Sequence, residues 1–438
     1  MALVSLRLKN FKSFLDTTDV PLAPLTLIFG RNNTGKSSLL QSLLLLRQTL
    51  DAPEYGARLN LRGPLYAAGS YFDLVHQHRS KEHVVMNFGL ELAPPRRRAE
   101  VELEFAPDEP QPPRLVRMKV VSPGVQPLSI RRGRGAGGPY ELFIGEKSLG
   151  GERKAEFRFP LNRFLPLIGH IAGPADVEQN RARTAARTAI WEFTRTLQAI
   201  RAVGAFRRQP ERRYEFLGRA PDRIDAAGEY VVNALIEDST RKRRRGELTK
   251  SVNRWLRQVG KVRLLSLRRI SRAARLFEVR MRDTDSGRWA NLADVGFGIS
   301  QAFPVLVEGL RTPPEGLFLV QEPEIHLHPD AQLAMADFLI TLVQSGRRVL
   351  AETHSEHLLL RVRQRLLRKD LAQSDVSIIY VDKTRSGASH ARQLTLDELG
   401  QIKDWPGGFM EEATKERLAL MTRMAKRAES AASSSNGE

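Results

Sequence analysis

Several kinds of chemistry are excluded by what the chain lacks. Its 438 residues include no cysteine, which excludes disulfides, thiolate catalysis and cysteine zinc sites. No apolar run approaches the roughly 20 residues that a membrane-spanning helix requires. Arg7 and Lys9 come too early in the N-terminal segment for the apolar core of a signal peptide. We therefore expect a soluble, cytoplasmic protein without a membrane partner.

Acidic residues are in the minority, with 50 Asp and Glu against 69 Lys and Arg, which gives a net charge of +19. The excess is uneven, because the segment from Arg241 to Arg280 holds 15 Lys or Arg and only two acidic residues, a local charge of +13. Such a concentration indicates a polyanionic partner, most often nucleic acid. A solvated helix face explains it equally well. The candidate nucleic-acid contacts are Arg241, Lys242, Arg243, Arg244 and Arg245.

The apolar pattern predicts an α/β core that is assembled from both ends of the chain. Strands are expected at 3–8 and 25–29, a helix from Lys36, and alternating strands and helices again after residue 276. Between them lie a β-meander and then, from about Asp176 to Gly260, apolar residues at helical spacing. We predict an N-terminal ATPase lobe with the meander at 1–150, an inserted, mostly helical basic lobe at 151–275, a C-terminal ATPase lobe at 276–425 and a disordered tail at 426–438.

The segment "GRNNTGKSS" follows an apolar strand and opens a helix, which is the context of a phosphate-binding loop. Gly30 and Gly35 leave room for backbone N–H groups to surround phosphates. Lys36 supplies a positive charge to the β- and γ-phosphates, and Ser37 offers a hydroxyl to Mg²⁺. A capped helix start is the alternative, which the flanking strand and helix disfavour. The predicted nucleotide contacts are Gly30, Arg31, Asn32, Asn33, Thr34, Gly35, Lys36, Ser37 and Ser38.

A second polar cluster lies in "LFLVQEPEIHLHP", where Gln321, Glu322 and Glu324 follow a buried strand. In a phosphate-loop protein this strand end carries the Mg²⁺ ligand and the carboxylate that activates water. We predict Glu322 as the general base and Gln321 beside Ser37 at the metal. The alternative is that the acids only stabilise a helix N-terminus. His326 and His328 are too few for a metal site, because no third ligand is evident nearby.

Two further segments complete the candidate site. His354, in "AETHSEHLL", follows another apolar strand, which we expect to end at the same sheet edge as the phosphate loop. It is a candidate phosphate sensor. "DVGFGISQ" places two glycines and a serine before a helix, and a helix N-terminus binds anions. Its predicted nucleotide contacts are Gly296, Gly298, Ser300 and Gln301.

These four elements, in this order, resemble the ABC-type ATPases of the SMC and RecF kind, and the OLD (overcoming lysogenization defect) family most closely. "LRLKNFKSF" and "GRNNTGKSS" look like its opening, "VGFGISQ" its signature, "EPEIHLHP" its Walker B segment and "ETHSEHLL" its switch histidine. The resemblance implies a head-to-tail homodimer or higher oligomer. ATP would lie between Lys36 of one chain and Ser300 of the other, with Glu322 activating water and His354 contacting the γ-phosphate. Asp73 or Gln77 would fill the Q-loop position.

Two departures from the family pattern shape the functional expectation. Gln321 stands where the family usually has an acid, and an uncharged amide holds Mg²⁺ less tightly. We therefore expect slow hydrolysis. The nuclease (Toprim) domain of full OLD proteins needs a D-x-D cluster after the ATPase, and none follows His354. "DWPGGFMEE" instead resembles a C-terminal region of relatives without that domain. "DTD", at 283–285, reads as a hairpin turn.

The sequence supports two functions of different classes. One is an ATPase switch without nuclease activity of its own, which uses ATP and Mg²⁺ to control a nuclease or toxin effector in anti-phage defence. The other is an SMC- or RecF-like ATPase that clamps DNA during repair or maintenance, with the basic segment as its contact. A scaffold that binds ATP and barely hydrolyses it is a third, weaker reading.

Overall fold

The computed structural model describes most of the chain. It describes residues 2–52, 57–92, 97–133, 140–148, 161–162, 165–166, 176–216, 218–220, 226–240, 246–271, 275–397, 400–407 and 419–424. The predicted basic cluster Arg241–Arg245 and the predicted tail at 426–438 lie outside these residues.

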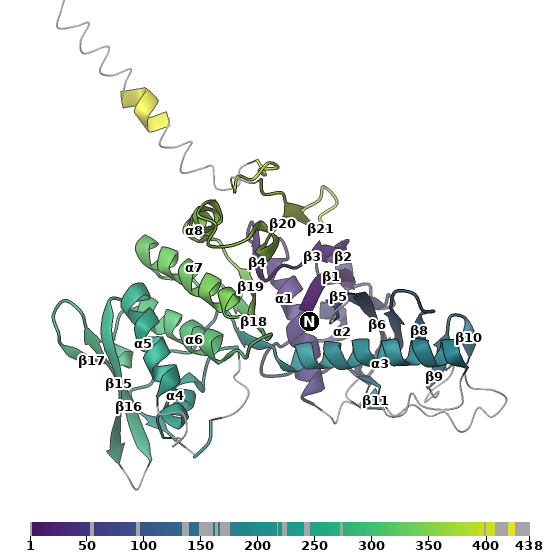
Figure 1. Ribbon diagram of the computed structural model, residues 1–438, viewed down its shortest axis with the longest axis horizontal. Helices are drawn as coiled ribbons and strands as arrows, with labels where there is room; N and C mark the ends of the chain where they lie inside the picture. Colours follow the sequence, from purple (N-terminus) through teal and green to yellow (C-terminus); the bar gives the residue numbers. More distant parts are fainter. Residues whose placement is uncertain are drawn as a thin grey trace, which may run out of the picture.

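A six-stranded sheet, counted over the described residues, forms the centre of the molecule (Figure 1). Its strand order is β13-β18-β19-β4-β20-β21, and all neighbours are parallel except β20 and β21. The N-terminal strand β4 pairs with β19 and β20 from the end of the chain, which confirms the α/β core built from both ends. The strands are β13 (Arg201–Val203), β18 (Leu317–Gln321), β19 (Arg348–Glu352), β4 (Leu25–Gly30), β20 (Val376–Lys383) and β21 (Ser389–Leu394).

Both faces of this sheet are buried, as a parallel sheet requires. Along β4, Leu25 and Leu27 pack into one hydrophobic core and Ile28 into the other, because successive side chains point to opposite faces. Helix α1 (Lys36–Leu50) covers one face. On the other face, α6 (Phe297–Arg311) and α7 (Pro329–Gln344) pack against the strands, and α8 (Glu356–Leu367) packs against α7.

A second, antiparallel sheet carries the predicted meander and packs on the α1 side. Helix α3 (Val177–Gln198) lies along it and contacts β1, β5, β6, β7, β8 and α1 (Figure 1). The strand order of this sheet is β10-β9-β8-β7-β6-β5-β1-β2, and β3 also pairs with β1. The strands are β1 (Ala2–Phe11), β2 (Phe14–Asp16), β3 (Val20–Pro21), β5 (Val84–Glu91), β6 (Arg98–Asp108), β7 (Gln111–Val121), β8 (Leu128–Arg132), β9 (Tyr140–Ile144) and β10 (Lys147–Ser148).

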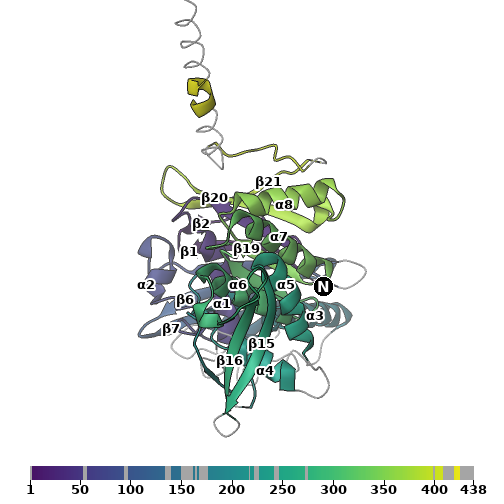
Figure 2. The same cartoon turned by 90° about the vertical axis from the view of Figure 1, so that its left-hand side faces the viewer.

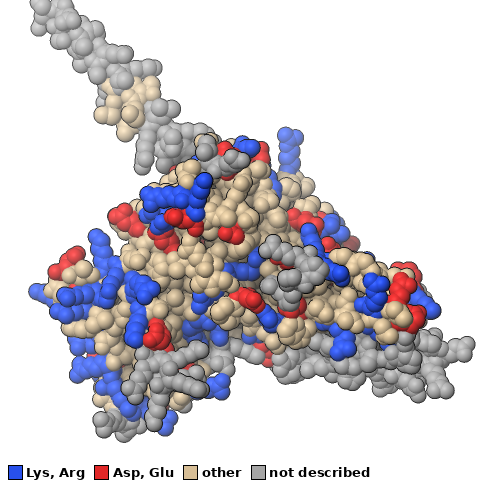
Figure 3. All heavy atoms as spheres, in the orientation of Figure 1, with Lys and Arg blue, Asp and Glu red and all other residues tan. Residues whose placement is uncertain are grey.

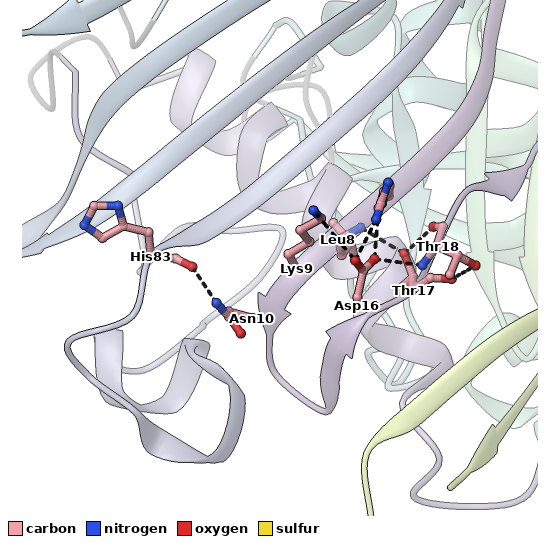
Figure 4. Close-up of polar contacts among 8 residues, drawn as sticks. Leu8, Lys9, Asn10, Asp16, Thr17, Thr18 and His83 are labelled. Carbon is pink, nitrogen blue, oxygen red and sulfur yellow. Dashed lines mark hydrogen bonds and ion pairs between the residues drawn. The ribbon is translucent and has the colours of Figure 1, made fainter.

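The hairpin of β1 and β2 places its turn against the phosphate loop. Arg7 donates from Nε and Nη2 to the Asp16 carboxylate at 2.9 and 2.7 Å, and the Leu8 N–H donates to Thr17 Oγ1 at 2.9 Å (Figure 4). At the turn, the carbonyl of Ser13 accepts from the N–H of Ser389 at 2.8 Å. The hairpin is therefore fixed both along its strands and at its tip.

A third group of elements lies beyond α6 and α7. Helices α4 (Val231–Thr240) and α5 (Glu247–Val259) pack with α6 and α7, and next to them lies a sheet of order β14-β16-β15 with β17 on β16. The hairpin of β15 and β16 extends away from the rest of the molecule (Figure 2). The strands are β14 (Tyr214–Glu215), β15 (Val262–Ser271), β16 (Leu276–Asp283) and β17 (Trp289–Asn291).

The helices expected in one inserted lobe are thus divided between two places. Helix α3 packs on the N-terminal sheet, whereas α4 and α5 pack near the C-terminal helices. The predicted domain limits stay a prediction. The remaining short elements are α2 (Tyr71–Leu74), η2 (His76–His78), β11 (Leu161–Asn162), β12 (Leu165–Pro166), η4 (Leu292–Asp294) and η5 (Gln373–Asp375).

Candidate nucleotide-binding site

The phosphate loop connects the C-terminal end of β4 to the N-terminus of α1. Both of its glycines are required by the backbone. Gly30 has φ +151° and a Cβ there would lie 2.1 Å from the Val381 carbonyl oxygen, while Gly35 has φ +97° and a Cβ would lie 2.1 Å from Ser13 Oγ. Only glycine fits both the conformations and the space. Arg31, Asn32 and Asn33 are exposed at the loop surface.

Lys36 and Ser37 stand in the first turn of α1, where unpaired N–H groups and the helix dipole favour an anion. Lys36 is 4% exposed, and its Nζ donates to the Arg31 carbonyl at 2.8 Å. Burial lowers the pKa of Lys36, while the negative charges of Glu352 and Glu322 oppose this shift. A buried cation beside two carboxylates and a loop of N–H groups suits a phosphate with a bound metal.

The ends of β18 and β19 bring a second set of polar groups to the same place. Ser37 Oγ donates to Glu352 Oε1 at 2.7 Å, and Gln321 Nε2 donates to Glu352 Oε2 at 2.7 Å. The N–H of Glu322 donates to the Glu352 carbonyl at 2.7 Å, which fixes Glu322 just past the strand end. The structure thus brings the phosphate loop and the predicted Walker B residues together, with Glu352 between them.

His354 follows Glu352 and is accessible to solvent. Partial burial and the charge of Lys36 lower its pKa, while Glu322 and Glu352 oppose this shift. Its backbone N–H donates at 2.8 Å to Glu324 Oε1, which also accepts from the Thr353 hydroxyl at 2.6 Å. Burial raises the pKa of Glu324. Glu324 therefore holds the segment that carries His354.

Arg207 connects the Walker B strand to the signature helix α6. Its side chain is 8% exposed and donates to the carbonyls of Gly204, Gln301, Gln321 and Glu322 at 3.0, 3.0, 2.6 and 2.8 Å. Burial lowers its pKa to about 10, and the charges of Glu324 and Glu322 oppose this shift. One buried guanidinium thus fixes the backbone of the signature helix relative to that of the Walker B segment.

The predicted signature segment forms the N-terminus of α6. Gly296 and Phe297 are exposed, and the ring of Phe297 lies 4.7 Å from that of His326. Ser300 is 4% exposed, and its hydroxyl donates to the Phe297 carbonyl at 2.7 Å. The groove beside this helix end is lined by Gln258–Lys261, Gly296–Ile299, His326–His328, Asp330 and Ala331, with no phosphate-loop residue among them. Within one chain, the helix end therefore presents Gly296–Gly298 rather than the Ser300 hydroxyl.

The two Q-loop candidates differ in what their side chains do. Asp73 caps the short helix α2, because its Oδ2 accepts from both the N–H and the hydroxyl of Ser70 at 2.9 and 2.7 Å. Gln77 is exposed and its Oε1 accepts from Arg79 at 2.9 Å. The His76 ring beside it contacts the Lys12 carbonyl in the β1–β2 turn at 2.9 Å. Both side chains are exposed, so Asp73 and Gln77 stay the two alternatives for the Q-loop position.

The remaining motifs have structural roles. "DTD" lies in the turn between β16 and β17, where the Asp283 carboxylate accepts from the Ser286 N–H at 2.6 Å. His328 caps α7. Among the residues that the structure describes, no group of three or more His, Asp or Glu is placed to hold a metal ion. A metal at the phosphate loop would therefore need ligands of mixed type.

Glu352 and Arg207 were not among the residues singled out from the sequence. Glu352 lies in the quoted "AETHSEHLL", and the available signal was an acidic residue at the C-terminal end of an apolar strand. Arg207 lies in a loop, and its four carbonyl partners come from three separate segments. No local pattern marks such a residue.

Comparison with known families gives three matches. Residues 1–86, which contain the phosphate loop, match a family described as "AAA ATPase domain". Residues 154–361, which contain the signature, Walker B and switch segments, match "AAA domain, putative AbiEii toxin, Type IV TA system". Residues 371–420, which include "DWPGGFMEE", match "Protein of unknown function (DUF3696)". Together with the phosphate loop on a parallel sheet, the first two matches show that the chain contains regions similar to ATPase domains of the AAA type.

Among solved structures, three SMC head domains are similar to the chain. An SMC head domain from Thermotoga maritima is 11% identical, with 90% of this chain and 100% of that chain covered and a TM-score of 0.42. An SMC head bound to the C-winged helix domain of ScpA is 12% identical, with coverages of 91% and 99% and a TM-score of 0.44. An SMC head with an extended coiled coil, bound to the C-terminal domain of ScpA from Pyrococcus furiosus, is 11% identical, with coverages of 96% and 99% and a TM-score of 0.40.

At these TM-scores and identities, the similarity carries no conclusion about function. No curated protein matches the sequence. No helix in the described ranges is long and apolar enough to cross a membrane.

Proposed function

We propose that this protein binds and hydrolyses ATP with Mg²⁺ and works as an OLD-like, ABC-type dimeric switch that controls an effector protein in anti-phage defence. One observation carries the nucleotide site. Five side chains from three segments interact at one edge of the sheet. They are Lys36 and Ser37 on α1, Glu322 after β18, and Glu352 and His354 at the end of β19. The buried lysine and the helix N-terminus suit phosphates, and the carboxylates suit Mg²⁺ and water activation.

Dimerisation is supported by the position of the signature helix. The exposed N-terminus of α6 opens onto a groove that contains no phosphate-loop residue. Its N–H groups therefore suit a phosphate bound to a second copy of this chain. Since Arg207 holds α6 to the Walker B strand, a contact across the dimer at α6 would be coupled to the water-activating carboxylate.

The effector is proposed from two observations on this chain. The "DTD" segment is a turn that caps its own backbone. The family matched by residues 154–361 is itself described as "AAA domain, putative AbiEii toxin, Type IV TA system", which is consistent with a defence setting. We propose that the partner carries the nuclease or toxin activity.

The effector proposal is tested by capture from the native host. Tagged Glu322→Gln protein with ATP, which should keep its nucleotide, is compared with Lys36→Ala protein, which should not bind it. We expect one protein with a nuclease or toxin activity to be retained in a nucleotide-dependent manner. Equal retention by both variants, or none in either, contradicts the switch.

A second candidate function, a DNA clamp in repair or maintenance, is favoured by the basic surface around β15 and β16. Lysines and arginines gather over this end of the molecule (Figure 3). Arg263, Arg268 and Arg269 are exposed on β15. Arg268 shares the carboxylate of Glu278 with Arg280, at 3.4 and 3.8 Å, so positive charge is in excess there. A projecting strand pair with excess arginine suits a phosphate backbone.

This second function predicts a salt-dependent interaction. Changing Arg263 and Arg268 to Gln should reduce the slope of log K against log salt for duplex DNA by about 0.9 for each phosphate that the variant no longer neutralises. Changing residues Arg241–Arg245 to Gln as well should reduce this slope further. The matched control is Arg181→Gln with Arg187→Gln, two exposed arginines on α3, which should leave the slope unchanged. An unchanged slope in the β15 variant, measured by fluorescence anisotropy, rejects DNA binding by this surface.

A further inference from the structure

Glu352 occupies a central position in the site. It is 5% exposed, and both of its carboxylate oxygens are used: Oε1 accepts from Ser37 Oγ at 2.7 Å, and Oε2 accepts from Gln321 Nε2 at 2.7 Å. It thus joins the phosphate-loop serine to the position on β18 where the resembled family has an acid.

Strand register explains how Glu352 reaches Ser37. In the parallel sheet, Gln321 on β18 pairs with Glu352 on β19, and Glu352 in turn pairs with Ile28 on β4. Leu350 packs into the core on the α1 side. Because side chains alternate along a strand, Glu352, two residues on, points to that same side. Its carboxylate therefore lies one strand closer to the phosphate loop than the side chain of Gln321.

The chemistry of the three side chains assigns them different roles. An ionised carboxylate only accepts hydrogen bonds, so the Gln321 amide turns its NH₂ towards Glu352. Mg²⁺ takes oxygen ligands and is bound through one or two carboxylates together with substrate phosphates. The oxygens of Ser37 and Glu352 lie 2.7 Å apart. This is close to the edge, about 2.9 Å, of an octahedron with metal–oxygen bonds of about 2.0–2.1 Å.

We propose that Glu352 is the carboxylate that holds Mg²⁺ together with Ser37, and that Gln321 orients Glu352 instead of contacting the ion. The negative charge missing from β18 is thereby restored from β19. The inference rests on the proposed nucleotide site. It removes the reason for expecting weak metal binding, because a buried carboxylate takes the place of the neutral amide.

The test measures what the metal contributes to ATP binding, without using hydrolysis. Dissociation constants for a fluorescent ATP analogue are measured in EDTA and in Mg²⁺, and their ratio is compared between variants. Glu352→Gln should lower this ratio by about 10–100-fold or more, because losing even a residue that only orients a metal ligand costs about this much. Its affinity in EDTA should stay close to that of the wild type. Glu356→Gln, four residues further on at the start of α8, is the matched control and should keep the ratio.

A charge swap separates a metal ligand from a structural carboxylate. In Gln321→Glu with Glu352→Gln, the acid returns to β18 and the amide moves to β19, so most of the wild-type ratio should be recovered. Glu352→Asp, which keeps the charge, should lose less than Glu352→Gln and remains informative if the amide variant folds poorly. The inference is overturned if Glu352→Gln leaves the ratio unchanged. It is also overturned if the swap recovers no more of the ratio than the single variant, or if the wild type itself has a ratio of one.

Failure of the nucleotide site looks different. If the wild type binds no ATP in either condition, or if Lys36→Ala binds it as well as the wild type, then the proposed function is wrong. If ATP binds through Lys36 while Glu352→Gln keeps its metal dependence, only the assignment of Glu352 is wrong.

Discussion

Lys36→Ala is expected to weaken ATP binding by about 100-fold or more, because a hydrogen bond to a charged group contributes about 1.5–3 kcal/mol and the phosphates would also lose a facing buried charge. The fold should survive the change. The Arg31 carbonyl that accepts from Lys36 also accepts from the Thr34 hydroxyl at 2.8 Å, so no carbonyl loses its only partner. Helix α1 is held by buried leucines such as Leu39 and Leu43.

Isothermal titration calorimetry with ATP and Mg²⁺ measures this effect, with thermal unfolding as the check on folding. The matched control is Lys81→Ala, at an exposed lysine in the turn before β5, which should bind ATP as the wild type does. Equal affinity in the wild type and in Lys36→Ala would remove the phosphate-loop assignment.

Glu322→Gln is expected to reduce hydrolysis by about 10²–10⁴-fold, the usual contribution of a general base. The amide matches the carboxylate in shape. The contacts that fix this residue are made by its backbone, with N–H to the Glu352 carbonyl and C=O to Arg207. The variant should therefore bind ATP and retain it. If ATP joins two chains, the retained nucleotide should hold them together.

Light scattering with and without ATP tests the dimer. We expect Glu322→Gln with ATP and Mg²⁺ to reach about twice the chain mass of 49.3 kDa. The double variant, Lys36→Ala with Glu322→Gln in the same chain, should stay a monomer under the same conditions. No ATP-dependent change in mass, together with an unchanged hydrolysis rate, would reject both the catalytic role of Glu322 and the nucleotide-held dimer.

The sequence by itself determined the phosphate loop. Its residues, Gly30 to Ser38, are contiguous, and the strand before them and the helix after them are visible as apolar patterns. Glycine was expected at positions 30 and 35 from the loop pattern, although the atoms that a Cβ would meet there, Val381 O and Ser13 Oγ, come from distant segments. The same holds for the ends of β18 and β19, where a run of apolar residues stops at polar ones. The α/β core built from both ends followed from these patterns.

Only the tertiary structure decided which polar groups meet. Ser37 and Glu352 are separated by 315 residues, and they meet because β19 pairs with β4. Strand order and register are set by packing on both faces of the sheet, and a shift of one residue would turn the Glu352 side chain to the opposite face. A sequence shows where strands end, but not which strands are neighbours.

Helices and loops show the same limit. The apolar stripe of α3 indicated that one face is buried, but not that it would pack on the N-terminal sheet while α4 and α5 pack near the C-terminal helices. Arg207 is a basic residue in a basic chain, and its role comes from four carbonyls of separate segments that meet around it. Local pattern thus determined the chemical groups and the element types. Long-range packing decided their partners, because burial and hydrogen bonding depend on what the rest of the chain brings alongside.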